Sequence, residues 1–126
     1  MPLLKNLFIN KTLLFLVVSM VSLSAMALDF NETQRLANQG DVVSQFYIGR
    51  MYSQGEGVRQ DYTKAREWYE KAANQGIAKA QFNLGVIYYH GEGVRQNIAT
   101  AKELFGKACD NGFQEGCDNY RKLNQK

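Results

Sequence analysis

The chain has 126 residues, a length that fits one globular domain and leaves too little for a second core. Residues 1–27 hold two of its 15 basic residues and no acidic one, so the remainder carries 13 basic and 12 acidic side chains. This near-neutral balance excludes the basic surface that nucleic-acid binding requires. After Pro2 there is no proline, and the abundance of Ala, Gln, Glu, Lys and Arg favours an all-α fold.

The N-terminal segment has the pattern of a signal peptide. Lys5 and Lys11 give it positive charge, residues 13–23 form an apolar run, and the small residues at 25–27 suit a cleavage site. The apolar run is much shorter than the roughly 20 residues that span a bilayer, and no cysteine follows it to carry a lipid. We therefore expect a signal peptide at 1–27, a mature domain at 28–126 without a stable membrane span, and a periplasmic or secreted protein.

A repeat with a period of 36 residues fills the mature segment. Shifting the sequence by this period aligns Gln45–Gly76 with Gln81–Gly112, and the hexapeptide GEGVRQ at 55–60 falls on its copy at 91–96. Internal repeats of this length are typical of solenoid proteins. The chain contains full repeats at about 42–77 and 78–113 and partial repeats at both ends.

Each repeat is predicted to form a pair of helices. In the first copy, Ile48 and Tyr52 are four residues apart, and the apolar residues of 65–72 follow the spacing of one helical face. Asp61 and Asn97 stand just before the second helices, where a short polar side chain caps the free N–H groups. Two such helices cannot bury their apolar faces alone, so the repeats must stack.

The repeat pattern is similar to that of a known family. Residues 80–97 read A-x-x-x-L-G-x-x-Y-x-x-G-x-G-V-x-x-N, which resembles the Sel-one-like repeat, a relative of the tetratricopeptide repeat. The resemblance covers nearly all of the mature domain. It implies a short right-handed α/α solenoid of helix-turn-helix units with a 36-residue period, whose concave surface holds protein partners.

Two sets of glycines recur with the repeat. Gly49 and Gly85 fall inside first helices, where glycine costs about 0.5 to 1 kcal/mol relative to alanine, so we expect a second helix to pack closely there. The Gly-Glu-Gly turns lack the strand, Lys and Ser/Thr of a phosphate-binding loop. We expect their glycines to allow positive φ between antiparallel helices. These turn glycines are Gly55, Gly57, Gly91 and Gly93.

Cys109 and Cys117 are the only cysteines, and eight residues separate them across a predicted helix-to-helix turn. This spacing can bring the two side chains within disulfide reach, and an exported protein meets an oxidising compartment. The segment KACDNGFQEGC also resembles the bridge-forming segment of a cysteine-rich secreted branch of the family. We predict a structural disulfide, because redox-active pairs usually have C-x-x-C spacing.

The first helices expose a strip opposite their packed face. Since the resemblance places first helices on the concave surface, partner-binding residues are predicted there: Arg50, Ser53, Lys79, Val86, Tyr89 and His90. Arg50 and Tyr89 are the best anchors, because Arg and Tyr are enriched among binding hot spots. Phe113–Leu123 aligns with a further first helix but has Arg121 at the position of Gly85, which indicates a capped array and a monomer.

These patterns predict an exported module that binds a protein partner. Two forms remain open: an immunity protein that neutralises a toxin, and an adaptor for envelope machinery. The cysteine-rich branch implies an alternative, penicillin binding or β-lactam hydrolysis. However, the two serines of the mature chain, Ser44 and Ser53, open no S-x-x-K motif. We predict no catalytic residue and no cofactor, and no metal site, because His90 is the only histidine.

Overall fold

The structure is a computed structural model that describes residues 29–125. The expected signal peptide lies outside the described residues. Residues 29–38 are helical and precede five further helices, and residues 29–125 contain no strand. These five helices are α2 (Val42–Gln54), α3 (Tyr62–Asn74), α4 (Ala78–His90), α5 (Ile98–Asp110) and α6 (Gln114–Asn124).

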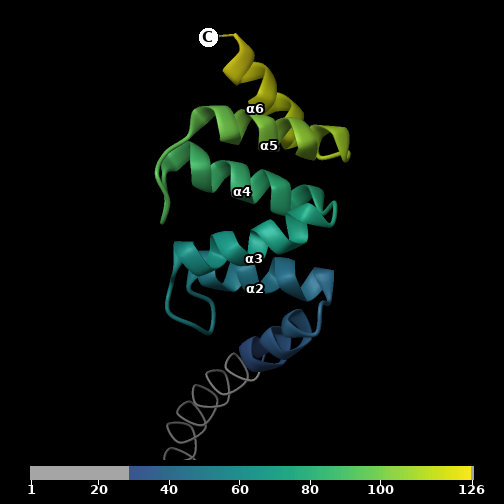
Figure 1. The fold of residues 1–126 in the computed structure, drawn as a ribbon, viewed down its shortest axis with the longest axis vertical. Coiled ribbons are helices and arrows are strands. Elements are labelled where there is room, and N and C mark those ends of the chain that lie inside the picture. Colours follow the sequence, from purple (N-terminus) through teal and green to yellow (C-terminus); the bar gives the residue numbers. More distant parts are fainter. Residues whose placement is uncertain (1–28, 126) are drawn as a thin grey trace, which may run out of the picture.

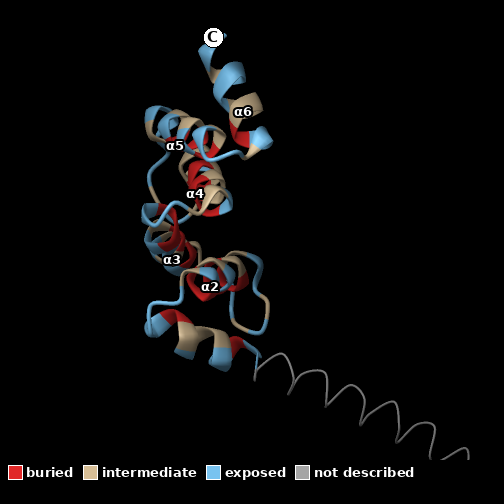
Figure 2. Cartoon of the chain, turned by 90° about the vertical axis from the view of Figure 1, so that its right-hand side faces the viewer, coloured by how far each residue is buried: buried red, intermediate tan, exposed pale blue. Residues whose placement is uncertain are grey.

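The helices stack one above another along the long axis of the molecule (Figure 1). Each helix from α2 onward packs against its neighbours in the sequence, which gives the pairs α2–α3, α3–α4, α4–α5 and α5–α6. In the edge-on view, α2, α4 and α6 lie to the right of α3 and α5 (Figure 2). The chain therefore forms a short all-α solenoid with a layer of first helices and a layer of second helices.

Short polar side chains fix where three of the helices begin. Asp41, Asp61 and Asn97 each accept a hydrogen bond from the backbone N–H three residues further on, at 2.8, 3.1 and 3.0 Å. Each bond satisfies one of the N–H groups that the first turn of a helix leaves without a partner. The two caps expected from the sequence, Asp61 and Asn97, begin the second helices α3 and α5.

A glycine in the left-handed conformation ends each second helix. Gly76 has φ +87° and follows α3 closely, and the N–H of Ile77 donates to the carbonyl of Ala72 at 3.2 Å. This bond belongs to a Schellman motif, which turns the chain sharply into the next helix. The same arrangement recurs at Gly112, between α5 and α6.

The longer turns within each repeat also depend on glycine. All four turn glycines have positive φ: Gly55, Gly57, Gly91 and Gly93. A Cβ at Gly93 would lie 2.8 Å from the backbone nitrogen of Thr63, and the hydroxyl of Thr63 donates to the Gly93 carbonyl at 3.3 Å. The second Gly-Glu-Gly turn therefore packs on the start of α3, which belongs to the preceding repeat.

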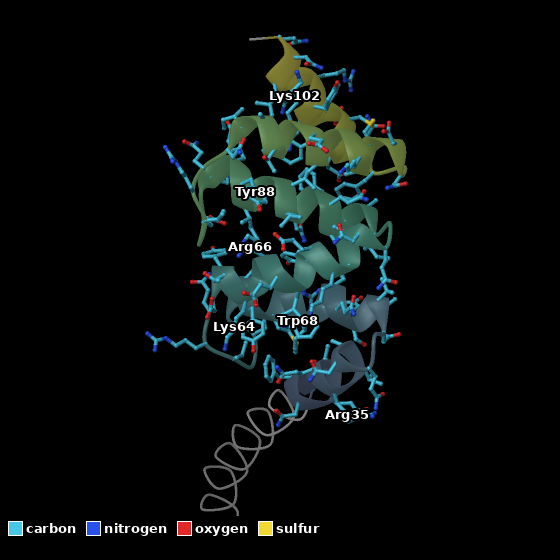
Figure 3. The ribbon with its side chains drawn as sticks, viewed as in Figure 1. Arg35, Lys64, Arg66, Trp68, Tyr88 and Lys102 are labelled. Carbon is cyan, nitrogen blue, oxygen red and sulfur yellow. A yellow bond between two sulfur atoms is a disulfide. The ribbon has the colours of Figure 1, made fainter. Side chains whose placement is uncertain are left out.

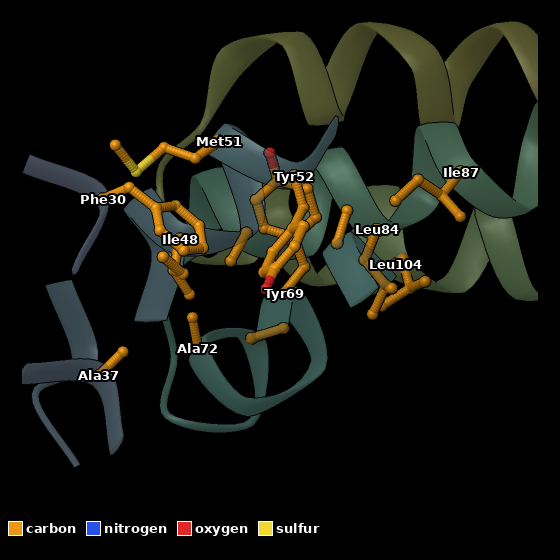
Figure 4. Packing of buried hydrophobic residues seen from close by; sticks show 13 residues of the cluster. Phe30, Ala37, Ile48, Met51, Tyr52, Tyr69, Ala72, Leu84, Ile87 and Leu104 are labelled. Atoms are coloured by element: carbon orange, nitrogen blue, oxygen red, sulfur yellow. The ribbon is translucent and has the colours of Figure 1, made fainter. Parts of the chain in front are cut away.

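The core runs along the stack between the two layers of helices. Figure 4 shows buried side chains of successive helices in contact, from Phe30 to Leu104. Within each repeat the two helices approach closely at a glycine of the first helix. A Cβ at Gly49 would lie 2.8 Å from the ring of Tyr69, and a Cβ at Gly85 would lie 2.8 Å from the ring of Phe105.

Buried glutamines connect one repeat to the next. The side-chain amide of Gln45 donates to the carbonyl of Ala37 at 3.4 Å, and that of Gln81 donates to the carbonyl of Ala73 at 3.1 Å. Both glutamines are at most 6% exposed. In each case the bond joins the end of a second helix to the first helix that follows it, so the same interaction recurs at two successive junctions.

A polar contact between side chains of α3 and α4 supports the junction between these two helices. Arg66 forms an ion pair with Glu70 at 2.8 Å, and the hydroxyl of Tyr88 donates to the same carboxylate oxygen at 3.4 Å. Figure 3 shows Arg66 and Tyr88 in the region where α3 faces α4. The carboxylate of Glu70 thus contacts both repeats.

Replacing Gly85 with leucine tests the close approach of α4 and α5. The new side chain would meet the ring of Phe105, and overpacking of this kind costs about 1 to 3 kcal/mol. We expect Gly85→Leu to lower the melting temperature by several degrees, measured by circular dichroism. Val43→Leu is the matched control, because Val43 is 57% exposed. An unchanged melting temperature for Gly85→Leu would contradict the packing account.

Candidate protein-binding groove

A hollow of about 220 Å³ lies between the first helices α2 and α4. Tyr69, from α3, is buried at this place and lies against Gly49. Residues of both first helices, the first residue of α3 and one residue of the turn after α4 contribute the remaining wall. The lining residues are Ser53, Gln54, Tyr62, Tyr69, Asn83, Val86, Ile87 and Glu92.

A second hollow, of about 280 Å³, lies between α4 and α6. Its lining residues are Val86, Tyr89, His90, Phe105, Asn119, Lys122 and Leu123. Val86 lines both hollows, so they are adjacent on the face formed by the first helices. We call these two hollows together the groove.

The floor of the groove is aromatic. Tyr69 lines the α2–α4 hollow and Phe105 lines the α4–α6 hollow, and each of these rings packs on the glycine of its own repeat. The hydroxyl of Tyr69 lies 3.3 Å from the hydroxyl oxygen of Ser53. Burial raises the pKa of the Tyr69 phenol above its ordinary value, an effect that hydrogen bonding to Ser53 and Asn83 partly offsets. The ring therefore presents a neutral hydroxyl to the groove.

Four of the six residues predicted to bind a partner line the groove. Ser53 lies in the α2–α4 hollow, Tyr89 and His90 lie in the α4–α6 hollow, and Val86 lies in both. The rings of Tyr89 and His90 meet edge to face, with their centroids 5.0 Å apart. The structure thus brings these four side chains together on one face.

The other two predicted residues do not line either hollow. Arg50 pairs with Glu56 at 3.2 Å and stacks over the ring of Tyr47 at 5.1 Å. Arg50 lies one turn before Ser53 of the α2–α4 hollow, whose hydroxyl donates to the Arg50 carbonyl at 2.9 Å. Lys79 is exposed near the start of α4. Arg50 is therefore at the edge of the groove, and its charge is already balanced by a carboxylate.

Ten of the fourteen lining residues of the groove were not among the predicted partner-binding residues, and these include Asn83, Asn119 and Lys122. The signal was present in the repeat, because Asn119 is 36 residues after Asn83 and Lys122 is 36 residues after Val86. Applying the predicted strip of α4 to the next segment would have found Lys122 but not Asn119, because Asn83 was itself absent from that strip. Lys122 was omitted because its segment was interpreted as a cap.

The disulfide Cys109–Cys117 joins the end of α5 to the first half of α6, with the two Cα atoms 4.5 Å apart. The bridge spans the short turn between these helices. The bridge holds the helix that supplies Asn119, Lys122 and Leu123 to the groove. It therefore supports the α4–α6 hollow as well as the fold.

The serine hydroxyls have structural partners. Ser44 donates to the carboxylate of Asp41 at the start of α2, and Ser53 donates to the carbonyl of Arg50 at 2.9 Å. Among residues 29–125, no group of three or more His, Cys, Asp or Glu side chains is arranged to hold a metal ion. Within the same part of the chain, no helix has the length and apolar character that crossing a membrane requires.

The fold and the groove define a helical-repeat solenoid protein. The Sel1 repeat family matches residues 42–77 and 78–113, which together make up more than half of the chain. The chain therefore belongs to the Sel1 repeat family, a class of helical solenoid typical of protein-protein interaction modules. No curated protein matches this chain.

Three solved structures show what this chain resembles. A protective antigen of uropathogenic Escherichia coli with an SLR fold is 32% identical to this chain, with a TM-score of 0.77. The match covers 80% of this chain and 22% of that protein. A Sel1 repeat protein from Oxalobacter formigenes is 28% identical with a TM-score of 0.71, covering 75% and 38%. Cysteine-rich protein B of Helicobacter pylori is 28% identical with a TM-score of 0.66, covering 71% and 67%. The chain thus spans less than half the length of the first two.

Removing the disulfide should loosen α6. On the chain-entropy model a loop of this size is worth about 2 to 3 kcal/mol, so we expect Cys109→Ser/Cys117→Ser to lower the melting temperature by roughly 10 °C. Hydrogen exchange should become faster in α6 and stay slow in α3. A reducing agent should lower the melting temperature of the native protein and leave that of the double variant unchanged. Equal melting temperatures for the native protein and the double variant, both measured without reducing agent, would show that the bridge does not support this end of the stack.

Proposed function

We propose that this protein is exported and holds a segment of a protein partner in the groove. The observation that carries the proposal is that side chains from three successive first helices line two hollows that meet at Val86. A surface built from several repeats offers a partner more contact than any single helix could. Such a surface is the usual binding site of helical-repeat proteins.

The side chains at the centre of the groove suit protein recognition. Tyr89 is half-buried and packs on His90, so its ring loses little conformational freedom when a partner binds. Val86 offers an aliphatic contact between the two hollows. Buried aromatic anchors with apolar neighbours carry much of the energy in protein interfaces.

The disulfide and the N-terminal pattern support export. Disulfides persist in oxidising compartments such as the periplasm and the extracellular space, and Cys109 is bonded to Cys117. In such a compartment a partner is either a secreted toxin, which would make this chain an immunity protein, or a resident envelope protein, which would make it an adaptor. The identity of the retained partner decides between these two forms.

Affinity capture from envelope extract and culture fluid tests the proposal. The native protein is compared with Val86→Ala/Tyr89→Ala, which removes the aliphatic and aromatic contacts at the centre of the groove. We expect one protein to be retained by the native bait and to be reduced at least tenfold on the double variant, since each lost hot spot costs about 1 to 2 kcal/mol.

A variant outside the groove serves as the matched control. Ile98 is 42% exposed at the start of α5 and lines neither hollow, so Ile98→Ala should retain the partner like the native bait. Circular dichroism of all three baits establishes that they are equally folded. If the groove variant retains the same proteins as the native bait, the groove is not the binding surface and the proposal fails.

A further inference from the structure

The two hollows of the groove differ in charge. The α4–α6 hollow contains Lys122 and His90, and none of its described lining residues is Asp or Glu. The α2–α4 hollow contains Glu92, and none of its described lining residues is Lys or Arg. The groove is therefore polarised along the stack, with its cationic end at α6.

Ion pairs within the fold leave this polarity in place. On α6, the carboxylate of Asp118 is bound by Arg121 and lies one turn before Lys122, whose charge also acts on it, so this single carboxylate faces two cations. Arg50 occupies the position of Lys122 two repeats earlier, but its guanidinium pairs with Glu56. The cation at the α2 end is thus paired with a carboxylate of its own repeat, whereas Asp118 is shared by Arg121 and Lys122 and does not line the α4–α6 hollow.

Apolar surface lies beside the cationic group. Val86 and Leu123, both half-buried, line the same hollow as Lys122, above the buried ring of Phe105. An apolar side chain of a partner would cover the floor while a neighbouring carboxylate meets the ammonium group. Electrostatic complementarity of this kind selects among partners more than it adds to affinity.

The size of the hollows favours a linear segment over a compact small molecule. Pockets for small ligands usually measure about 300 to 1,000 Å³, and these two are about 280 and 220 Å³. Each hollow has room for one or two side chains of a partner. Asn83 and Asn119 occupy the same repeat position in the two hollows, and an amide side chain can both donate to and accept from a peptide backbone.

We infer that the groove recognises a linear segment of its partner in which an acidic residue lies next to an apolar one, with the carboxylate at Lys122 and the apolar side chain against Val86 and Leu123. This inference rests on the proposed function and adds the chemistry of the partner to it. The juxtaposition that carries it is a cationic side chain beside an apolar floor, in a hollow whose described wall contains no carboxylate.

Selection from a phage-displayed library of random linear peptides tests the inference. The library is panned in parallel on the native protein and on Lys122→Glu, which reverses one exposed charge. Peptides selected on the native protein should be enriched in Asp or Glu next to an apolar residue, and peptides selected on the variant should be enriched in Lys or Arg at that place. Synthetic peptides from the first selection should bind Lys122→Glu about fivefold more weakly or worse, with affinity that falls as salt is added.

Lys107→Glu is the matched control, because Lys107 lies on α5 outside the groove and pairs with Glu103. It should bind the selected peptides like the native protein. Peptides that lose binding on Tyr89→Ala but show no acidic preference would overturn the inference and leave the proposed function standing. Recovery of no groove-dependent peptide would also overturn it, while affinity capture judges the proposed function separately.

Discussion

The close approach of two helices at a glycine is the contact on which the structure depends. In each repeat an aromatic ring of the second helix lies where a Cβ of the first helix would otherwise be, as for Gly85 and Phe105. The same rings form the floor of the groove, because the first helices pack low enough on the second layer for Tyr69 and Phe105 to reach the hollows. Helix packing and the shape of the groove therefore have one physical origin, because a larger residue at either glycine would separate the helices and displace the floor.

Successive repeats are joined at the same position by two kinds of bond, a hydrogen bond at two junctions and a disulfide at the third. Gln45 and Gln81 each reach back eight residues to a carbonyl at the end of the preceding second helix. At the third junction Cys109 and Cys117 occupy the same repeat positions, so a covalent bond stands where the earlier junctions have a hydrogen bond. The stronger bond suits a helix with little buried surface, since Gly116 is the only buried residue of α6.

The sequence predicted those features that depend on neighbours in the chain. The helix pairs, the caps at Asp61 and Asn97 and the proximity of the two cysteines all follow from periodicity, propensity and the length of a turn. The groove was predicted only in part. That Arg50 pairs with Glu56 depends on the path of the Gly-Glu-Gly turn, which brings residues six apart together and has no helical spacing to reveal it.

Treating the last segment as a cap concealed its contribution to the groove. Arg121 departs from the repeat at the position that faces a second helix, but Asn119 and Lys122 lie on the side that faces the groove. A helix can lose the pattern on one face and keep its role on the other, because the two faces have different neighbours. At the groove position the chain carries Arg50, Val86 and Lys122 in successive repeats. The helix is retained at this position from repeat to repeat while the side chain changes from paired cation to apolar to cation, and this variation gives the groove of a repetitive scaffold a polarity along the stack.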